Sequence, residues 1–217
     1  MIASGETAVL VHGLGGSTLL MSPLASRLKR VGYGAVNWSY SSYRKTIERH
    51  GRRLCERLTA LDNDAQVSRI HLVTHSMGSI VARCALQTKR PEKLGRIVML
   101  APPNCGSPLA AFWGPKLRWC TPIVDELAKR PDSFVNCLPL PDGVEIGIIA
   151  ASHDFMVGPG NTYLACQRDC IILPATHTFL LFRRCAADEV IQFLSTGQFS
   201  TAACRRSDRL PRTGRGG

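Results

Sequence analysis

Ser76 lies in a pattern that can make a serine nucleophilic. An apolar run over residues 70–73 precedes Thr74-His75-Ser76-Met77-Gly78, and a helical pattern follows directly. That order predicts a sharp strand-to-helix turn that lifts a serine hydroxyl clear of its neighbours, although a helix N-cap serine is the alternative. The residues two before and two after the serine must be small, and Thr74 stands where glycine is usual. At the helix start, the amide of Met77 would point at an oxyanion forming beside Ser76.

A glycine-rich loop follows an earlier apolar run. Residues 8–11 read as a buried strand, and His12-Gly13-Leu14-Gly15-Gly16 comes next. Such a loop can supply a second oxyanion donor, and the amide of Leu14 is the candidate. Neither Gly-Lys-Ser/Thr nor the G-x-G-x-x-G spacing is present, so a nucleotide phosphate loop is excluded. We interpret His12 as a residue that orders the loop rather than as a catalytic one.

Two later strands are followed by the groups that a serine nucleophile needs. A serine hydroxyl requires a histidine to accept its proton and a carboxylate to orient that histidine. Asp154 follows the apolar run 144–151, and His177 follows the run 170–173. Both therefore lie where a parallel α/β sheet places its site. Other histidines and aspartates fall inside predicted strands, helices or intervening segments, and are weaker candidates.

With these segments together, the chain resembles the α/β-hydrolase superfamily, specifically its compact bacterial serine esterases and lipases. The resemblance covers about residues 7–195 and is carried by five segments: 11–16, 74–78, Leu100-Ala101-Pro102-Pro103-Asn104, and the segments around Asp154 and His177. It implies that Ser76 is the nucleophile, His177 the base and Asp154 the acid, with Leu14 and Met77 as oxyanion donors. It also implies that no metal or organic cofactor is needed. The chain begins at what looks like the third strand of the family fold.

The remaining pattern predicts an α/β fold with a mostly parallel six-stranded sheet, helices on both faces and a small cap insertion. Strands are expected near residues 8–12, 34–38, 69–74, 96–101, 144–151 and 169–173. Helices are expected near residues 18–31, 44–62, 77–89, 119–130 and 183–195. Alternation of this kind favours parallel strands joined by right-handed crossovers. The resemblance implies the strand order 4-3-5-6-7-8 in the numbering of the superfamily.

The chain length and composition predict a single domain, which the resemblance identifies as a hydrolase domain over residues 1–203. With 217 residues, of which 45% are hydrophobic, the chain can bury a single sizeable core. The segment 104–143 interrupts the alternation with six prolines and several apolar residues, and by resemblance it is expected to form the cap. Residues 204–217 hold five arginines and one aspartate, and are expected to be a disordered tail.

The net charge, the apolar runs and the cysteine content limit which partners and which compartment we expect for the protein. The net charge is +11 and the pI about 9.6, partly because of the tail. The tail could contact nucleic acid or an anionic membrane weakly, but a solvated tail is the preferred interpretation, and no nucleic-acid partner is expected. No apolar run is long enough for a transmembrane helix, and no signal peptide is recognisable. Most of the nine cysteines are interpreted as free thiols in a reducing, cytoplasmic compartment, with a Cys120–Cys137 disulfide as the alternative.

The expected activity is the hydrolysis of carboxylic esters, from small molecules or lipids, through an acyl-enzyme. A thioesterase or acyltransferase using the same triad stays open, because these differ only in the acceptor. A non-catalytic binding protein of the same fold is the alternative from a different class. The physiological substrate and the oligomeric state are left open by the sequence.

Overall fold

A parallel six-stranded sheet forms the centre of the protein. The computed structural model describes residues 5–43, 45–117 and 122–200. The tail 204–217 and Cys120 lie outside the described residues. The sheet has the order β2-β1-β3-β4-β5-β6, and every neighbouring pair is parallel. The parallel six-stranded sheet is the predicted one. Its strand order is the order that the resemblance implies.

The strands and the long helices alternate along the chain. The strands are β1 (Glu6–Val11), β2 (Gly34–Trp38), β3 (Arg69–His75), β4 (Leu94–Leu100), β5 (Ile146–Ala151) and β6 (Asp169–Leu173). The flanking helices are α1 (Thr18–Arg30), α2 (Ile47–Asp62), α3 (Met77–Thr88) and α7 (Arg184–Thr196). Two 3₁₀ turns, η1 (Pro159–Asn161) and η2 (Phe179–Phe182), lie in the loops that follow β5 and β6. None of the helices in the described part of the chain is long and apolar enough to cross a bilayer.

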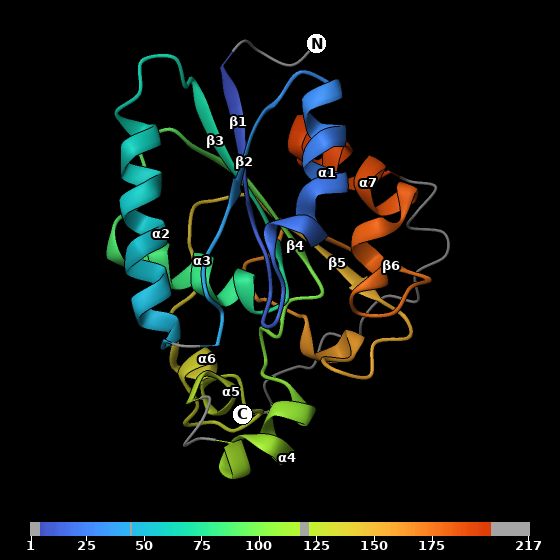
Figure 1. Ribbon diagram of the computed structural model, residues 1–217. Helices are drawn as coiled ribbons and strands as arrows, with labels where there is room; N and C mark the ends of the chain where they lie inside the picture. The colour runs from blue at the N-terminus through green and yellow to red at the C-terminus, as the bar shows by residue number, and fades with distance from the viewer. Residues whose placement is uncertain (1–4, 44, 118–121, 201–217) are drawn as a thin grey trace.

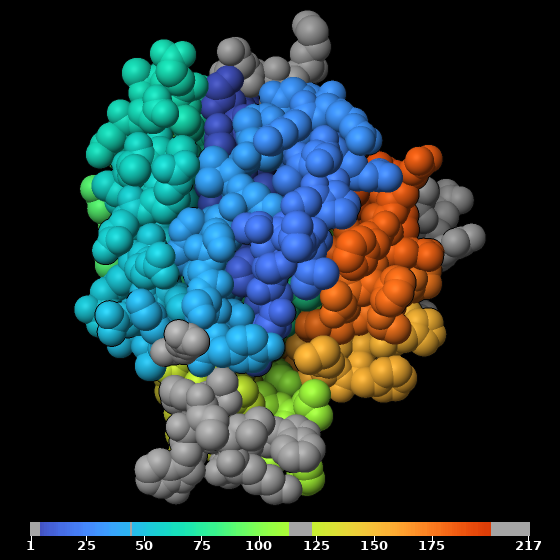
Figure 2. All heavy atoms as spheres, viewed as in Figure 1, coloured from blue at the N-terminus to red at the C-terminus, as the bar shows by residue number. Residues whose placement is uncertain are grey.

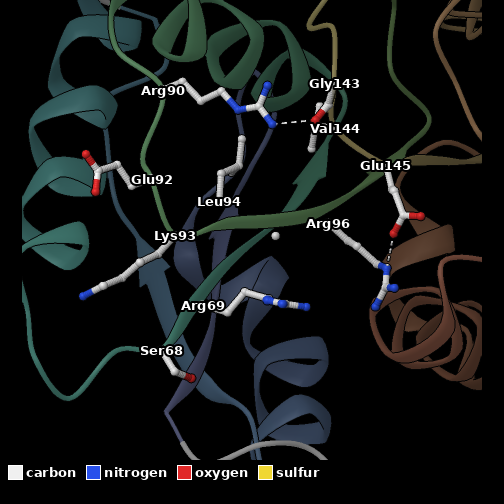
Figure 3. A pocket seen from close by; sticks show the side chains of 11 residues that line it. Ser68, Arg69, Arg90, Glu92, Lys93, Leu94, Arg96, Gly143, Val144 and Glu145 are labelled. Carbon is white, nitrogen blue, oxygen red and sulfur yellow. Dashed lines mark hydrogen bonds and ion pairs between the residues drawn. The ribbon is translucent and has the colours of Figure 1, made fainter.

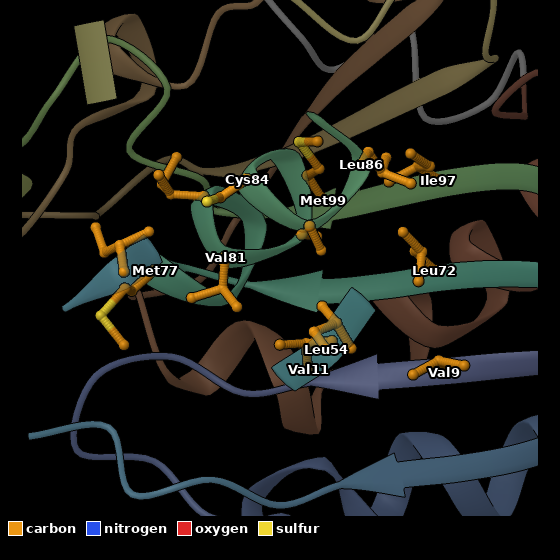
Figure 4. Close-up of a cluster of buried hydrophobic side chains, with 14 of the residues drawn as sticks. Val9, Val11, Leu54, Leu72, Met77, Val81, Cys84, Leu86, Ile97 and Met99 are labelled. Atoms are coloured by element: carbon orange, nitrogen blue, oxygen red, sulfur yellow. The ribbon is translucent and has the colours of Figure 1, made fainter. Parts of the chain in front are cut away.

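Each face of the sheet is covered by two helices. In Figure 1, α1 and α7 lie on one side of the sheet, and α2 and α3 lie on the other. Alternate residues of each strand point to opposite faces, so two buried clusters form. Val9, Leu72 and Met99 face α2 and α3 (Figure 4), whereas Leu10 and Val73 face α1 and α7. Because both faces are covered, the central strands are apolar almost throughout.

The segment 104–143 gathers at the carboxyl end of the sheet. It contains α4 (Pro108–Leu117), α5 (Pro122–Glu126) and α6 (Phe134–Cys137), which lie below the sheet in Figure 1. In Figure 2 the green and yellow atoms of this segment lie at the lower end of the molecule. The carboxylate of Glu126 accepts a hydrogen bond from the amide of Ile47 at 2.8 Å, and so ties this segment to the start of α2.

The helix predicted near 119–130 differs from the structure. The described helix there spans Pro122–Glu126, and α4 and α6 are additional. The chain leaves the helical path after Glu126 because its backbone pairs with another segment: the amide of Ser107 donates to Leu127 O at 2.8 Å. The sequence contains no local signal for that pairing.

Candidate active site

Ser76 lies at a strained turn between β3 and α3. Its φ is 51° and its ψ −129°. A positive φ is unfavourable for a residue with a side chain, so the surrounding structure must hold it there. The amide of Ser76 donates a hydrogen bond to Leu100 O at 2.9 Å, which ties the turn to β4.

Two glycines allow the first loop and α3 to pack closely against this turn. A Cβ on Gly78 would lie 2.4 Å from Val11 O and 2.5 Å from His12 O. A Cβ on Gly13 would lie 2.8 Å from Ser76 Cβ. Such contacts are shorter than close-packed atoms allow, so both positions require glycine for the packing that is seen.

Thr74 occupies the position where glycine is usual in this motif. Its side chain is fully buried, and its Oγ1 lies 2.8 Å from Ser79 Oγ on α3. The hydroxyl therefore has a partner, and its burial does not leave a polar group unsatisfied. Threonine is therefore accommodated in place of glycine by one hydrogen bond between β3 and α3.

Ser76, His177 and Asp154 form a continuous chain of hydrogen bonds. His177 Nε2 lies 2.8 Å from Ser76 Oγ, and His177 Nδ1 lies 2.7 Å from Asp154 Oδ2. When Nδ1 donates to the carboxylate, Nε2 is left as the acceptor for the serine hydroxyl. The three side chains come from loops that follow β3, β5 and β6. The sequence-predicted residues are thus brought together.

Asp154 is held in its ionised form. Burial raises the pKa of its carboxyl, but the hydrogen bond and charge interaction with His177 and the amides of Val157 and Met156 outweigh burial. The net result is a pKa below the ordinary value for aspartate. Those amides donate to Asp154 Oδ1 at 3.0 and 2.9 Å, so one oxygen is fixed and the other faces His177.

His75 has a role in the site that the sequence analysis did not predict. Its ring is buried, its Nε2 lies 3.2 Å from His177 O, and its centroid is 4.9 Å from that of His177. Burial lowers the pKa of His75 to about 3. A neutral ring with its proton on Nε2 can donate to the carbonyl and hold the loop of His177. The contact joins residues 102 positions apart in sequence, so no local pattern could have indicated it.

His12 packs within the glycine loop, away from the Ser76 hydroxyl. Its Nδ1 lies 2.9 Å from Gly13 O, and its ring stacks on Tyr40 with centroids 4.3 Å apart. Burial lowers the pKa of His12. The Tyr40 hydroxyl donates to His12 O at 2.7 Å, so this aromatic pair fixes the path of the loop.

The amides of Leu14 and Met77 are the oxyanion donors that the sequence predicts, from the glycine loop after β1 and from the first residue of α3. In the glycine loop, the amide of Gly15 donates to Ser42 Oγ at 3.0 Å and that of Gly16 donates to Gly13 O at 3.1 Å. Within the residues that the structure describes, neither the Leu14 amide nor the Met77 amide has a backbone or side-chain acceptor. Both are therefore available to an incoming oxygen.

A cavity of about 370 Å³ opens above Ser76 and His177. Its apolar lining includes Leu14, Leu20, Leu109, Ala110, Val124, Leu127, Met156 and Val157. Four of these residues, from Leu109 to Leu127, come from α4, α5 and the turn after α5. The cavity therefore combines an apolar wall with a polar floor, which is the usual character of a site for a small organic ligand.

The described residues contain no cluster that could hold a metal ion and no disulfide. No group of three histidine, cysteine, aspartate or glutamate side chains lies close enough together in that part of the chain. Among the described cysteines, free thiols are found at Cys55, Cys84, Cys105, Cys137, Cys166 and Cys185. The cysteine proposed as the partner of Cys137, Cys120, lies outside the described residues.

Comparison with known proteins identifies the fold. Residues 6–103 match a family model described as "Putative serine esterase (DUF676)". This match covers β1 to β4, including the glycine loop and the turn at Ser76. No curated protein matches the chain in sequence.

Solved structures match over most of the chain. The mature lipase BlEst2 of Bacillus licheniformis is 17% identical, with a TM-score of 0.74 over 90% of this chain and 93% of that chain. The metagenomic carboxyl esterase MGS0156 is 19% identical, with a TM-score of 0.68 over 82% of this chain and 66% of that one. The monoacylglycerol lipase of Paleococcus ferrophilus is 15% identical, with a TM-score of 0.65 over 90% and 98%.

The protein therefore has the α/β-hydrolase fold. The matching family model is described as a serine esterase, and these solved structures are described as lipases and an esterase.

Proposed function

We propose that the protein is a serine hydrolase that cleaves carboxylic esters through an acyl-enzyme. The observation that carries this proposal is the hydrogen-bonded chain from Ser76 Oγ to His177 and on to Asp154, with 2.8 and 2.7 Å between the atoms concerned. A helix N-cap role for Ser76 does not account for it: the side chain makes no capping hydrogen bond to α3.

The first half of the reaction transfers the acyl group to the enzyme. Ser76 Oγ attacks the carbonyl carbon of the ester while its proton passes to His177 Nε2. The carbonyl π pair moves onto oxygen, and the amides of Leu14 and Met77 donate to that oxyanion. When the tetrahedral intermediate collapses, the ester C–O bond breaks and the leaving alcohol takes the proton from His177.

The second half returns the enzyme to its starting state. Water gives a proton to His177 and attacks the acyl-enzyme carbonyl, and Ser76 is expelled with that proton. Asp154 stays ionised throughout and stabilises the imidazolium, which agrees with its lowered pKa. The apolar wall of the cavity favours an acyl chain over a charged group, because a charge would lose its hydration there.

A fluorophosphonate probe tests the proposal directly, since it labels only activated serines. We expect covalent label on Ser76, located by peptide mass, and no label after His177→Ala. The chain offers a matched control: Ser152 Oγ lies 2.8 Å from His153 Nδ1 on the exposed surface, without a carboxylate partner. Ser152→Ala should leave both labelling and ester turnover unchanged.

Turnover of a soluble p-nitrophenyl ester gives the second readout. Ser76→Ala should lower kcat/KM by about a thousandfold or more, while its unfolding transition stays that of the wild type. Turnover above about a thousandth of wild type in Ser76→Ala, or label on a different serine, would contradict the assignment. The same assay with thioester and alcohol acceptors distinguishes an esterase from a thioesterase or an acyltransferase.

A further inference from the structure

Two neighbouring hollows lie at the amino end of the sheet, where the strands begin. The first, of about 430 Å³, extends from the start of β3 across β4 to the residues before β5 (Figure 3). The second, also of about 430 Å³, lies between the start of β1, the residues after α1 and the last turns of α7. Arg69 and Arg96 line both, so the hollows meet at these side chains, and we call the pair the arginine hollow. Ser76 follows the opposite end of β3, so the arginine hollow is separate from the candidate active site.

Arg69 is the basic residue of this hollow whose side chain lacks a partner. It is exposed, and no hydrogen bond or ion pair joins its guanidinium to another residue in the described part of the chain. Arg90, by contrast, donates to Gly143 O at 2.6 Å. Arg96 donates to Glu145 at 2.6 Å, and Figure 3 draws both of these bonds. A guanidinium has five N–H donors, so those of Arg69 are all available to a ligand.

Gly95 lets the stem of Arg69 pack closely against β4. A Cβ on Gly95 would lie 2.8 Å from both Cγ and Cδ of Arg69 and 2.8 Å from His71 Cε1. Glycine within a strand commonly marks such a close approach. The stem of Arg69 is therefore held by packing, although the guanidinium at its end is unpaired.

A bulge in β4 brings Arg96 to the same hollow. The pairing of β3 with β4 shifts by one residue, so that Gly95 and Arg96 both lie opposite His71. The amide of Arg96 donates to His71 Nδ1 at 3.0 Å. Because Nδ1 accepts, the ring carries its proton on Nε2, which donates to Glu6 Oε2 at 3.0 Å. Bulges redirect side chains and are frequent beside functional sites, and here Arg96 lines both hollows as Arg69 does.

The charges beside Arg69 leave the hollow positive. Glu145 accepts from Arg96 at 2.6 Å and pairs with Arg168 at 2.7 Å, so one carboxylate is shared by two guanidinium groups. These three groups carry one net positive charge, and Arg69 adds a second. The other carboxylate of the first hollow, that of Glu92, points away from Arg69 and Arg96 in Figure 3. A dianion would therefore balance the charge of this part of the hollow.

The second hollow has room and polar groups for the organic part of a ligand. It is lined by the apolar residues Val31, Ile191 and Leu194 and by the polar residues Glu6, Tyr33 and Ser195. Oε1 of Glu6, unlike Oε2, makes no hydrogen bond within the described residues and can accept one from a hydroxyl group. The Tyr33 side chain is buried, and its hydroxyl has no partner in the same part of the chain. Burial raises the pKa of Tyr33 to about 12, so this hydroxyl keeps its proton.

We propose that the arginine hollow binds a small phosphate monoester that carries hydroxyl groups, such as a sugar phosphate. A phosphate monoester has about two negative charges at neutral pH, which balance the two positive charges, whereas a single carboxylate would leave one of them. The binding is separate from ester hydrolysis at Ser76 and does not depend on it.

The phosphate is placed between Arg69 and Arg96. The planar fork of Arg69 pairs with two phosphate oxygens at once. Arg96 adds the N–H groups that its bonds to Glu145 and Leu194 O leave unused. The organic part extends into the second hollow, where Glu6 accepts from a ligand hydroxyl.

Isothermal titration calorimetry of the full chain tests this site, with glucose 6-phosphate and inorganic phosphate as the probes. We expect glucose 6-phosphate to bind at least about threefold more tightly, because its hydroxyls reach the second hollow. Arg69→Gln should weaken its binding at least about tenfold. Arg69→Lys should weaken it at least about threefold, since lysine keeps the charge and loses the fork. Because Arg69 is exposed and unpaired, both variants should unfold at the wild-type temperature.

Arg49→Gln is the matched control. Arg49 is also exposed, and its side chain has no ion pair within the described residues. It lies in the first turn of α2, at the other end of the sheet from the arginine hollow. The variant removes the same charge from the protein, and its binding of glucose 6-phosphate should stay within about twofold of wild type.

Other results would overturn the proposal. The absence of binding by the wild type would do so, as would equal affinity for the two probes. Equal affinities of Arg69→Gln and Arg49→Gln would show that the net charge of +11, and not the hollow, attracts the ligand. Tighter binding of a single-stranded oligonucleotide than of glucose 6-phosphate, with the same dependence on Arg69, would show a nucleic-acid surface instead. Ester turnover enters none of these readouts, so the proposed function can fail while this site stands, and the reverse.

Discussion

Replacement of Gly78 by alanine tests the close packing that holds Ser76 in place. The new Cβ would lie 2.4 Å from Val11 O and 2.5 Å from His12 O. Both neighbours are backbone atoms at the end of β1, so neither can rotate away as a flexible side chain could. Relief therefore requires α3 to move away from the sheet, or the end of β1 to shift.

The expected loss of stability follows from that geometry. Overpacking a close-packed interior typically costs about 1–3 kcal/mol, and the backbone contacts place Gly78→Ala near the upper end of that range. For a chain of this size, about 3 kcal/mol corresponds to a drop in Tm of about 6–12 °C. Because Ser76 starts the same helix, its hydroxyl should be displaced, and kcat/KM for a soluble ester should fall at least about tenfold.

Gly160→Ala is the matched control, since a Cβ on Gly160 would meet no atom within 4 Å. Its Tm and kcat/KM should equal those of the wild type, or its Tm should rise slightly. Thermal unfolding by circular dichroism and initial rates of ester hydrolysis measure both effects. If Gly78→Ala kept the wild-type Tm and rate, the packing of α3 against the end of β1 would not be as close as we describe.

Three further outcomes follow from contacts in the core and the site. Thr74→Val leaves the Ser79 hydroxyl buried without its partner, so urea unfolding should show a loss of about 1–3 kcal/mol that adding Ser79→Ala largely recovers. Burial lowers the pKa of His50 to about 4, and from about pH 6.5 down to about 4 the unfolded chain binds a proton that the folded chain does not. The free energy of unfolding should therefore decrease by about 3 kcal/mol as the pH falls through that window, and a pH slope unchanged by His50→Gln would contradict this. His75→Leu removes the donor to His177 O and should lower kcat about tenfold with KM unchanged, and His75→Gln should restore much of the loss.

The strands and the site were predictable because their signals are local. An apolar run with a turn at its end identifies a buried strand and the position of its carboxyl end. In a parallel sheet those ends meet at one edge, so Ser76, Asp154 and His177 could be placed together from the sequence although the last lies 101 residues beyond the first. The strand order came from the resemblance rather than from any local pattern.

The features that were not predicted depend on contacts between distant segments. The ends of the helices in segment 104–143 follow from backbone pairing of Ser107 with Leu127 and from the hydrogen bond between Glu126 and Ile47. This segment contains prolines and apolar residues without a clear period, so its sequence does not indicate where the helices begin and end. The role of His75 was missed for the same reason, since its acceptor is a backbone carbonyl that any residue at position 177 would supply.

His177 follows a strand at one edge of the sheet. Strand β6, which leads to His177, is an edge strand paired only with β5, whereas Ser76 follows β3, which has a neighbouring strand on each side. Edge elements open at lower free energy than central ones, so the proton acceptor can separate from the hydroxyl while the rest of the sheet stays folded. Opening of this edge would therefore inactivate the site without global unfolding.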